Sequence, residues 1–264
     1  MTHTQPALFV PHGAPTFALR PGAAGAAIAE AARSLTLPRA IVVVSAHWDT
    51  AVPSVGFAAR PETIHDFGGF PDELYTLRYP ATGCREAAGE VVSAITAAGL
   101  PVQAVADRGL DHGAWVPLRL MFPDADVPVI PLSIQSAGGP EQAYRLGRAL
   151  APLAAKGFLV IASGNLTHNL RDYQTAARNG GRIPAYVREF ADWLASRLNA
   201  GDLPALLDYR RQAPGAVQAH PTDEHLLPLY VALGAGGENA EVSRLHAGVD
   251  DYVLAMDAYA FQPR

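Results

Sequence analysis

The sequence predicts an α/β fold in which helices flank a mostly parallel central sheet. Short apolar runs without polar alternation are typical of strands that are buried on both faces. The segments between these runs are alanine-rich and of helical length, and strands that alternate with helices favour a parallel sheet. The chain has 264 residues, of which 49% are apolar, and neither a repeat nor a clear linker divides it. We therefore expect a single domain over 1–264.

The expected elements alternate along the chain. A late stretch, "DYVLAMDAYAF" at 251–261, predicts a further strand, for which an edge position and an antiparallel direction are both open. The long segment 50–83 is rich in Gly, Pro and aromatic residues and reads as a loop. A loop of that length in a compact domain is typically functional or disordered, and its aromatic content argues against disorder. The other strands are expected at 7–10, 40–46, 127–134 and 158–163, and helices at 22–35, 85–99, 139–157 and 184–201.

Composition excludes several classes of function. The net charge is −5 and the isoelectric point is near 6.0, so neither nucleic acid nor an anionic membrane is an expected partner. No apolar stretch is long enough to span a bilayer, and the first residues lack the layout of a signal peptide. The single cysteine, Cys84, excludes an internal disulfide framework and fits a reducing compartment. We expect a cytoplasmic protein.

Histidines mark the ends of three predicted strands. There are nine histidines, most of them in Gly-, Pro- or Asn-rich turns. His12 follows the strand at 7–10, His47 ends the strand at 40–46, and His168 lies a few residues beyond the strand at 158–163. Ligands of open α/β sheets bind in the crevice outside the carboxyl ends of the strands. A lone histidine beside an apolar run is more often structural, but its repetition at three strand ends favours a shared metal site with nitrogen and oxygen ligands.

A further histidine is expected at the start of a helix within 219–237. Thr222 is a plausible N-cap, with Asp223 and Glu224 in the first turn, where carboxylates suit the helix dipole. His225 would then be about the third helical residue and point toward the sheet edge. Adjacent helical residues point about 100° apart, so Glu224 and His225 should not both bind one ion. His220, just before the cap, could line the pocket.

The segment 107–123 predicts another helix, with Asp111 as its N-cap and His112 at its first position. This helix would bury Trp115, Leu118 and Met121. A neutral imidazole at a helix N-terminus suits a base or a hydrogen-bond donor, and a capping histidine on the surface is the alternative.

These motifs together resemble one known family. The chain is similar to the class III extradiol ring-cleavage dioxygenases, and within them to the 4,5-DOPA dioxygenase-like bacterial proteins. The resemblance runs from about residue 6 to the last strand and is more specific for the family than for the substrate. It is carried by "PALFVPHGAPTFAL", "IVVVSAHWDT", "TIHDFGGFPDELYTLRYPATG", "LDHGAWVPL", "PVIPLSIQ", "IASGNLTHNL" and "HPTDEHLLPLYVALGA".

The resemblance implies a role for each of the five histidines. His12 and His47 match two metal ligands, and His225 matches the late metal ligand of the DOPA dioxygenase-like branch. His168 matches a fourth histidine that either ligates the metal or acts as acid and base beside it. His112 matches a histidine that contacts the substrate or oxygen.

A loop at 61–79 that borders the pocket is also implied by the resemblance, and it includes His65 and Asp66. Flat aromatic side chains are candidate walls for the substrate ring, although most such residues belong to the core. We expect the substrate pocket to involve His65, Asp66, Trp48 and His220, with Phe67, Phe70 and Tyr75 as further wall candidates.

The expected activity is a metal-dependent extradiol cleavage. A catechol of DOPA type would be opened with O2 to a muconate semialdehyde, with His168 as the base for one hydroxyl and later as an acid. Well-studied members of the wider family hold Fe(II) with two histidines and a glutamate, whereas this chain offers His225 beside Glu224. The divalent metal is therefore Fe(II) for dioxygenase activity or Zn(II) in the isolated protein. The alternatives are a zinc-dependent hydrolase and a non-catalytic binding protein on the same fold, and a monomer and a homodimer are both open.

Overall fold

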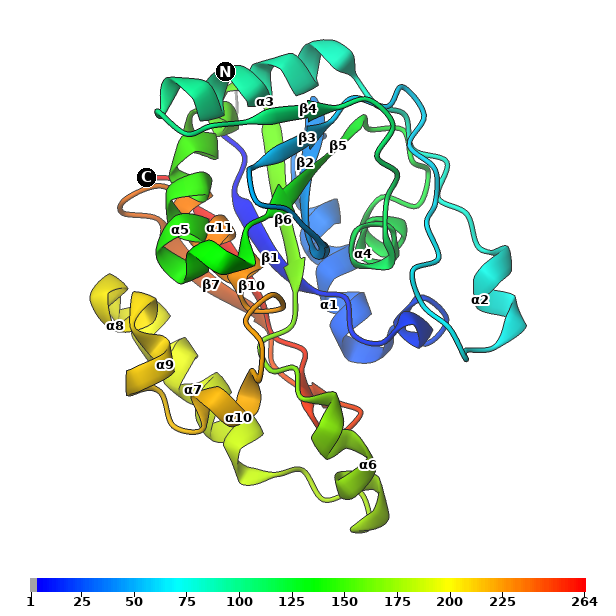
Figure 1. Cartoon of the computed structure of the whole chain (residues 1–264), viewed down its shortest axis with the longest axis vertical. Helices are drawn as coiled ribbons and strands as arrows, with labels where there is room; N and C mark the ends of the chain where they lie inside the picture. The colour runs from blue at the N-terminus through cyan, green and yellow to red at the C-terminus, as the bar shows by residue number, and fades with distance from the viewer. Residues whose placement is uncertain (1–3) are drawn as a thin grey trace.

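The computed structural model describes residues 4–264, and eight of its strands form one mixed sheet in the order β4-β3-β5-β2-β6-β1-β10-β7 (Figure 1). The four central strands β5, β2, β6 and β1 are mutually parallel. The strands are β1 (Ala7–Pro11), β2 (Ala40–Asp49), β3 (Ser54–Gly56), β4 (Gln103–Val105), β5 (Val129–Ile134), β6 (Phe158–Gly164), β7 (Glu241–His246), β8 (Val249–Asp250), β9 (Leu254–Ala255) and β10 (Ala258–Gln262).

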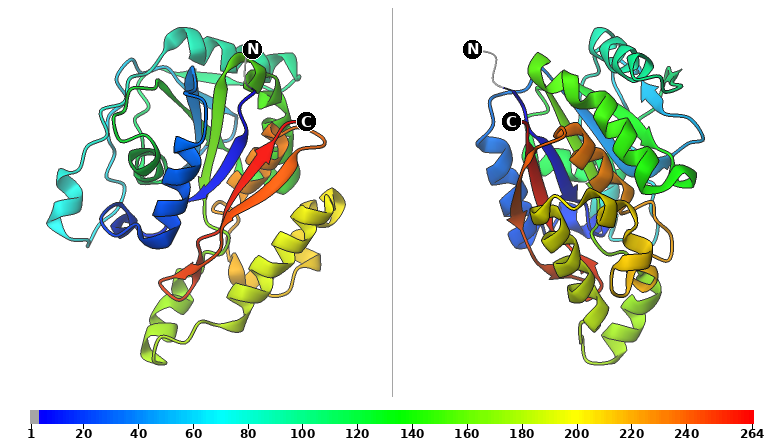
Figure 2. Two further views of the ribbon diagram at one scale, coloured as in Figure 1. Left: turned by 180° about the vertical axis from the view of Figure 1, so that it is seen from behind. Right: turned by 90° about the vertical axis from the view of Figure 1, so that its left-hand side faces the viewer.

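Helices cover both faces of this sheet, as Figure 2 shows. The α/β architecture expected from the sequence is confirmed. The helices are α1 (Gly22–Arg33), α2 (Asp72–Thr76), α3 (Arg85–Ala97), α4 (His112–Met121), α5 (Gly139–Leu150), α6 (Leu170–Arg178), α7 (Ala185–Ala200), α8 (Leu203–Leu207), α9 (Tyr209–Gln212), α10 (Ala216–Ala219) and α11 (Leu227–Ala235).

The absence of polar alternation in the central strands has a direct structural cause. Val42 and Val44 of β2 join an apolar cluster with α3, α5, α7 and α11, whereas Ile41 and Val43 join a second cluster with α1 and α4. Successive strand residues point to opposite faces, so a strand buried on both faces needs apolar residues throughout. The two cores hold the strands rigidly and fix the positions of the strand ends.

The late apolar stretch forms two strands instead of one. β9 pairs with β8, and β10 lies between β1 and β7, antiparallel to both. The antiparallel option was therefore right and the edge position was wrong. β7 occupies that edge, and its largely exposed sequence, which includes Glu241 and Arg244, gave no apolar run.

Two further expectations need correction. The segment 50–83 contains β3 and α2 in addition to loops, and both elements are short and lack an amphipathic pattern. The helix expected to begin near Thr222 begins at Leu227, so His225 lies in the turn before α11. Pro228 is at the start of that helix, where its missing N–H costs no hydrogen bond.

No helix within residues 4–264 combines the length and the apolar character needed to cross a membrane.

Candidate metal centre and active site

Five imidazoles from separate parts of the chain meet beside the carboxyl ends of β1, β2 and β6. The register pairs Pro11 with Gly164 and Ser45 with Ser163, so these three strands end at one level. His12 directly follows β1, and His47 lies near the end of β2. Their ring centroids lie 5.0 Å apart. The five rings, from His12, His47, His112, His168 and His225, line one cavity of about 580 Å³.

The imidazoles fall into two adjoining groups. The ligand atoms of His12, His47 and His112 lie within 4.8 Å of one another, as do those of His168, Glu224 and His225. The ring of His225 connects the groups, because its centroid is 5.3 Å from that of His12 and 5.0 Å from that of His47. The predicted convergence of these histidines is what the structure shows.

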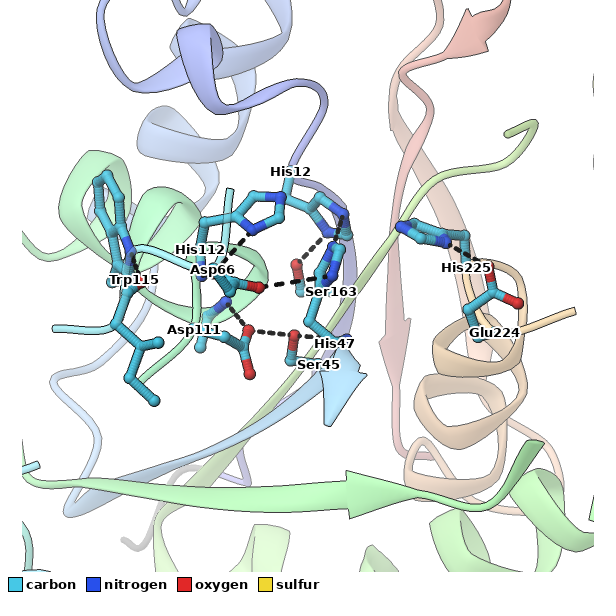
Figure 3. A network of polar contacts seen from close by, with 12 residues as sticks. His12, Ser45, His47, Asp66, Asp111, His112, Trp115, Ser163, Glu224 and His225 are labelled. Atoms are coloured by element: carbon cyan, nitrogen blue, oxygen red, sulfur yellow. Dashed lines mark hydrogen bonds and ion pairs between the residues drawn. The ribbon is translucent and has the colours of Figure 1, made fainter. Parts of the chain in front are cut away.

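Each of three imidazoles is held through its Nδ1 atom (Figure 3). The Nδ1 atom of His12 is 3.0 Å from the Ser163 hydroxyl, and that of His225 is 3.1 Å from a Glu224 carboxylate oxygen. The Nδ1 atom of His112 is 3.0 Å from Asp66. A histidine fixed in this way presents its other ring nitrogen, Nε2, to a metal or a substrate.

Asp66 stabilises two of the histidines. One of its oxygens accepts the backbone N–H of His112 at 2.8 Å as well as the ring contact, and the other is 3.6 Å from Nδ1 of His47. Partial burial alone would raise the pKa of this carboxyl, but the hydrogen bonds from His112 lower the pKa to about 2. Asp66 is therefore ionised, and it supports the imidazoles of His112 and His47 without lining the cavity.

A second support connects the end of β2 to α4. Asp111 accepts a hydrogen bond from the Ala114 backbone at 3.2 Å, which confirms it as the N-cap of α4. It also accepts the Ser45 hydroxyl at 2.5 Å, and Ser45 in turn accepts the backbone N–H of His47 at 3.1 Å. The Arg108 guanidinium donates to the remaining Asp111 oxygen at 2.6 Å. These hydrogen bonds join the start of α4 to the end of β2 at the site.

Burial keeps four of the five histidines neutral. It lowers the pKa of His12 and of His225 well below the ordinary value, and it lowers the pKa of His47 and of His168 to about 4. The hydrogen bond from His225 lowers the pKa of Glu224 to about 2. Neutral imidazoles are the form that binds metals, so the site is prepared for a cation at neutral pH.

The donor set also fits a metal by distance. The Nε2 atoms of His12 and His47 are 3.2 Å apart. Two nitrogens that each bind one tetrahedral ion at about 2.1 Å are separated by about 3.4 Å. Carboxylates behind ligating histidines are the usual arrangement around protein-bound metals, and Asp66 and Glu224 provide it here.

His168 differs from the other histidines in its surroundings. Its ring stacks on that of His225 with a centroid distance of 3.5 Å and an interplanar angle of 6°. Its backbone N–H donates to the Ala219 carbonyl at 2.9 Å, which ties the loop after β6 to α10. The ring is partly exposed to the cavity, so it can contact a small molecule there.

The rest of the cavity wall is largely apolar. Phe67 and Phe70 line it, as the sequence suggested, together with residues of α6 and of the β8–β9 hairpin that the sequence did not indicate. Those additional residues are Leu170, Tyr173, Gln174, Asp251 and Leu254. They lie in a polar helix and a short hairpin.

Four residues expected in the substrate pocket are not among those that line it. Trp48 follows His47 along β2 and therefore points to the other side, where Arg108 covers it at 4.9 Å. His65 contacts the Leu77 carbonyl at 3.1 Å. His220 is fully buried, with Nε2 at 2.8 Å from the Leu166 carbonyl. Asp66 is the fourth and supports the histidines from behind.

Comparison with known proteins gives a consistent result. The family model described as the catalytic LigB subunit of aromatic ring-opening dioxygenase matches residues 8–258. A protein of Beta vulgaris named 4,5-DOPA dioxygenase extradiol is 39% identical over 257 residues, which is 96% of this chain and 95% of the relative. A protein of the same name from Escherichia coli K12 is 38% identical over 258 residues, which is 95% of this chain and 92% of the relative.

A solved structure gives the same picture of the fold. The crystal structure of an uncharacterized protein from Escherichia coli K12 matches with a TM-score of 0.77 and 29% sequence identity. The match covers 97% of this chain and 99% of that chain.

Proposed function

The chain belongs to the family of the catalytic LigB subunit of aromatic ring-opening dioxygenase, and on that premise we propose that it opens a DOPA-like catechol to a muconate semialdehyde. It is an extradiol ring-cleavage dioxygenase that uses O2. The observation that supports the assignment to this cavity is the meeting of five imidazoles beside an apolar space of about 580 Å³, which is large enough for a catechol.

The proposed metal ligands are His12, His47 and His225. His12 and His225 are buried and His47 is half-buried, and the nitrogens of His12 and His225 that face away from the cavity are held by Ser163 and Glu224. A bound Fe(II) ion would supply the open positions at which a catechol and O2 are brought together, and a redox-active centre through which electrons of the catechol can pass to O2. Zn(II) also suits these nitrogens but has no redox chemistry.

His168 is proposed as the acid and base of the reaction. Burial lowers the pKa of His168 to about 4, so the neutral ring can accept a proton from a catechol hydroxyl at pH 7. The negative charge of the ionised catechol would then raise the pKa of the ring and let it return the proton during ring opening. The parallel stack on His225 holds it next to a proposed ligand throughout.

His112 is proposed to orient the substrate. Ionised Asp66 accepts a hydrogen bond from its Nδ1–H, which leaves Nε2 of this cavity-lining residue available to a substrate. This nitrogen can accept a hydrogen bond from a catechol hydroxyl. Because its ligand atoms also lie near those of His12 and His47, the metal content of His112→Ala tests the assignment: retention supports orientation, and loss indicates ligation.

The experiment that tests the function starts with protein loaded anaerobically with Fe(II). Addition of 4-methylcatechol and O2 should give a yellow ring-fission product with one O2 consumed per ring opened. The His65→Ala variant, whose imidazole lies off the cavity, is the matched control and should remain active. Hydrolysis of an ester or amide without O2 uptake would instead identify a zinc hydrolase, and metal binding without turnover would identify a binding protein.

A further inference from the structure

The described lining of the cavity contains one carboxylate and neither a Lys nor an Arg to balance it. Among the cavity-lining residues within 4–264, Asp251 is the single carboxylate, and neither Lys nor Arg is present. The part of a substrate that lies near Asp251 therefore meets a negative field.

Asp251 is held at the cavity by an unusual turn. It lies between β8 and β9 with a backbone φ of 47°, and the next residue, Tyr252, has a φ of 62°. Left-handed conformations are uncommon for residues other than Gly, and two in succession, one of them a bulky Tyr, are costly. Strain of this kind persists where surrounding structure enforces it, and it is concentrated at ligand sites.

The packing around Tyr252 provides that enforcement. A Cβ atom on Gly181 would lie 2.9 Å from Cε1 of Tyr252, so the absence of a side chain at 181 makes room for the Tyr252 ring. On the cavity side, the rings of Tyr173 and Tyr252 stack with centroids 6.1 Å apart. Figures 1 and 2 show this hairpin and α6 side by side at the same end of the molecule.

A carboxylate beside aromatic rings is the combination that recognises an ammonium group. The acid supplies charge and the face of a Tyr ring attracts a cation. A substrate carboxylate in the same place would be repelled by Asp251 and by its neighbour Asp250. Gln174 could donate a hydrogen bond to a carboxylate, but it brings no charge.

Two other groups do not reverse this preference. The N-terminus of α6 would favour an anion, but Asn169 caps it and Asp172 is in its first turn. Arg20 lines the neighbouring cavity together with Asp250 and Asp251. Among the described residues, no ion pair within 4.0 Å joins Arg20 to Asp251.

We propose that Asp251 binds a protonated amine on the side chain of the substrate, so that the enzyme prefers catechols with an ammonium group over those that end in a carboxylate. The proposal rests on the proposed function of the cavity, and it narrows the substrate class. Asp251 is a specificity residue in this account and takes no part in ring opening.

The test compares three catechols of similar size on the Fe(II)-loaded enzyme: dopamine, 3,4-dihydroxyphenylpropionate and neutral 4-methylcatechol. We expect kcat/KM to be highest for dopamine and lowest for the propionate. Asp251→Asn should lower the ratio of kcat/KM for dopamine to that for 4-methylcatechol about five-fold, the effect of a partly exposed ion pair. Asp250→Asn removes the same charge from a residue that does not line this cavity, and it should have a smaller effect.

The outcomes separate the two proposals. Equal or faster turnover of the propionate, or a dopamine preference that survives in Asp251→Asn, would overturn the role of Asp251 while ring opening stands. Failure of all three catechols, including the neutral one, would overturn the proposed function itself.

Discussion

A single methyl group at Gly164 should displace the proposed ligand His225. Gly164 is the last residue of β6, and a Cβ atom there would lie 2.2 Å from the backbone oxygen of His225 and 3.2 Å from its carbonyl carbon. Backbone atoms cannot rotate away as a side chain can. Gly164→Ala therefore increases the distance between the end of β6 and the His225 backbone by about 1 Å. The φ of Gly164 is not in the left-handed region, so the effect comes from space alone.

The displacement of His225 should lower both the stability of the protein and its metal affinity. The His225 oxygen accepts the Asn165 N–H at 2.9 Å, and the Asn165 side chain accepts the Gly13 N–H at 3.2 Å, so the movement reaches the loop of His12. Forced packing of this kind costs about 1–3 kcal/mol of stability. Misplacement of a ligand should also weaken metal binding about 10- to 100-fold, as loss of a supporting contact does.

Two measurements decide this prediction. Urea unfolding gives the free energy of unfolding, and anaerobic calorimetry gives the Fe(II) or Zn(II) affinity. Gly89→Ala is the matched control: nothing lies within 4 Å of the added methyl in α3, and the variant should be about 0.5–1 kcal/mol more stable with unchanged metal affinity. A folded Gly164→Ala protein that binds metal as tightly as the wild type would refute the reasoning.

Three other substitutions test separate parts of the account. His168→Ala should lower kcat about 10²- to 10⁴-fold while catechol binding, followed by a spectral titration, changes little; full turnover would remove His168 from the mechanism. Glu224→Gln should weaken metal binding about ten-fold, measured by calorimetry, because a neutral amide holds the His225 N–H less strongly; unchanged affinity would contradict this. Burial lowers the pKa of His220 to about 4 from an unfolded value near 6.5. The contribution of the neutral His220 ring to the free energy of unfolding is therefore fully present above pH 6.5 and is lost as the pH falls toward 4. Wild type should therefore lose about 2 kcal/mol more than His220→Gln between pH 7 and pH 5 in urea unfolding, and equal losses would refute that sign.

The central sheet and the convergence of the histidines were predictable because both depend on local patterns. A strand that is buried on both faces, such as "AIVVVSA", must be apolar throughout, and polar residues can begin only where it leaves the core. Parallel strands end at one edge of the sheet, so His12 and His47 were expected to meet. Asp111 as a helix N-cap follows equally from its own hydrogen-bonding chemistry.

Other features depend on tertiary contacts that no local pattern encodes. β7 lies at an edge and is largely exposed, so nothing required an apolar run there. Trp48 was expected in the pocket as a flat aromatic wall for the substrate ring, but the alternation of side chains along a strand places it on the other side. Asp251 reaches the cavity through a strained turn in a short hairpin, and neither the turn nor its direction is visible in the sequence.

The residues that support the histidines, Ser45, Ser163 and Glu224, were predictable only in part. Ser45 and Ser163 are small polar residues at strand ends, and the sequence does not indicate their partners Asp111 and His12. The expectation that Glu224 and His225 do not both bind one ion stays a prediction, and the helical geometry on which it was based does not apply. The two residues precede α11 instead of lying within it, and the carboxylate contacts the ring of His225 directly.

The most direct test of the whole account is a crystal structure of the protein loaded anaerobically with Fe(II), with the metal located by anomalous scattering. We expect one ion bound by the Nε2 atoms of His12, His47 and His225, with His168 and His112 facing the open positions. An ion bound elsewhere, or these three nitrogens too far apart to share one, would contradict the central claim.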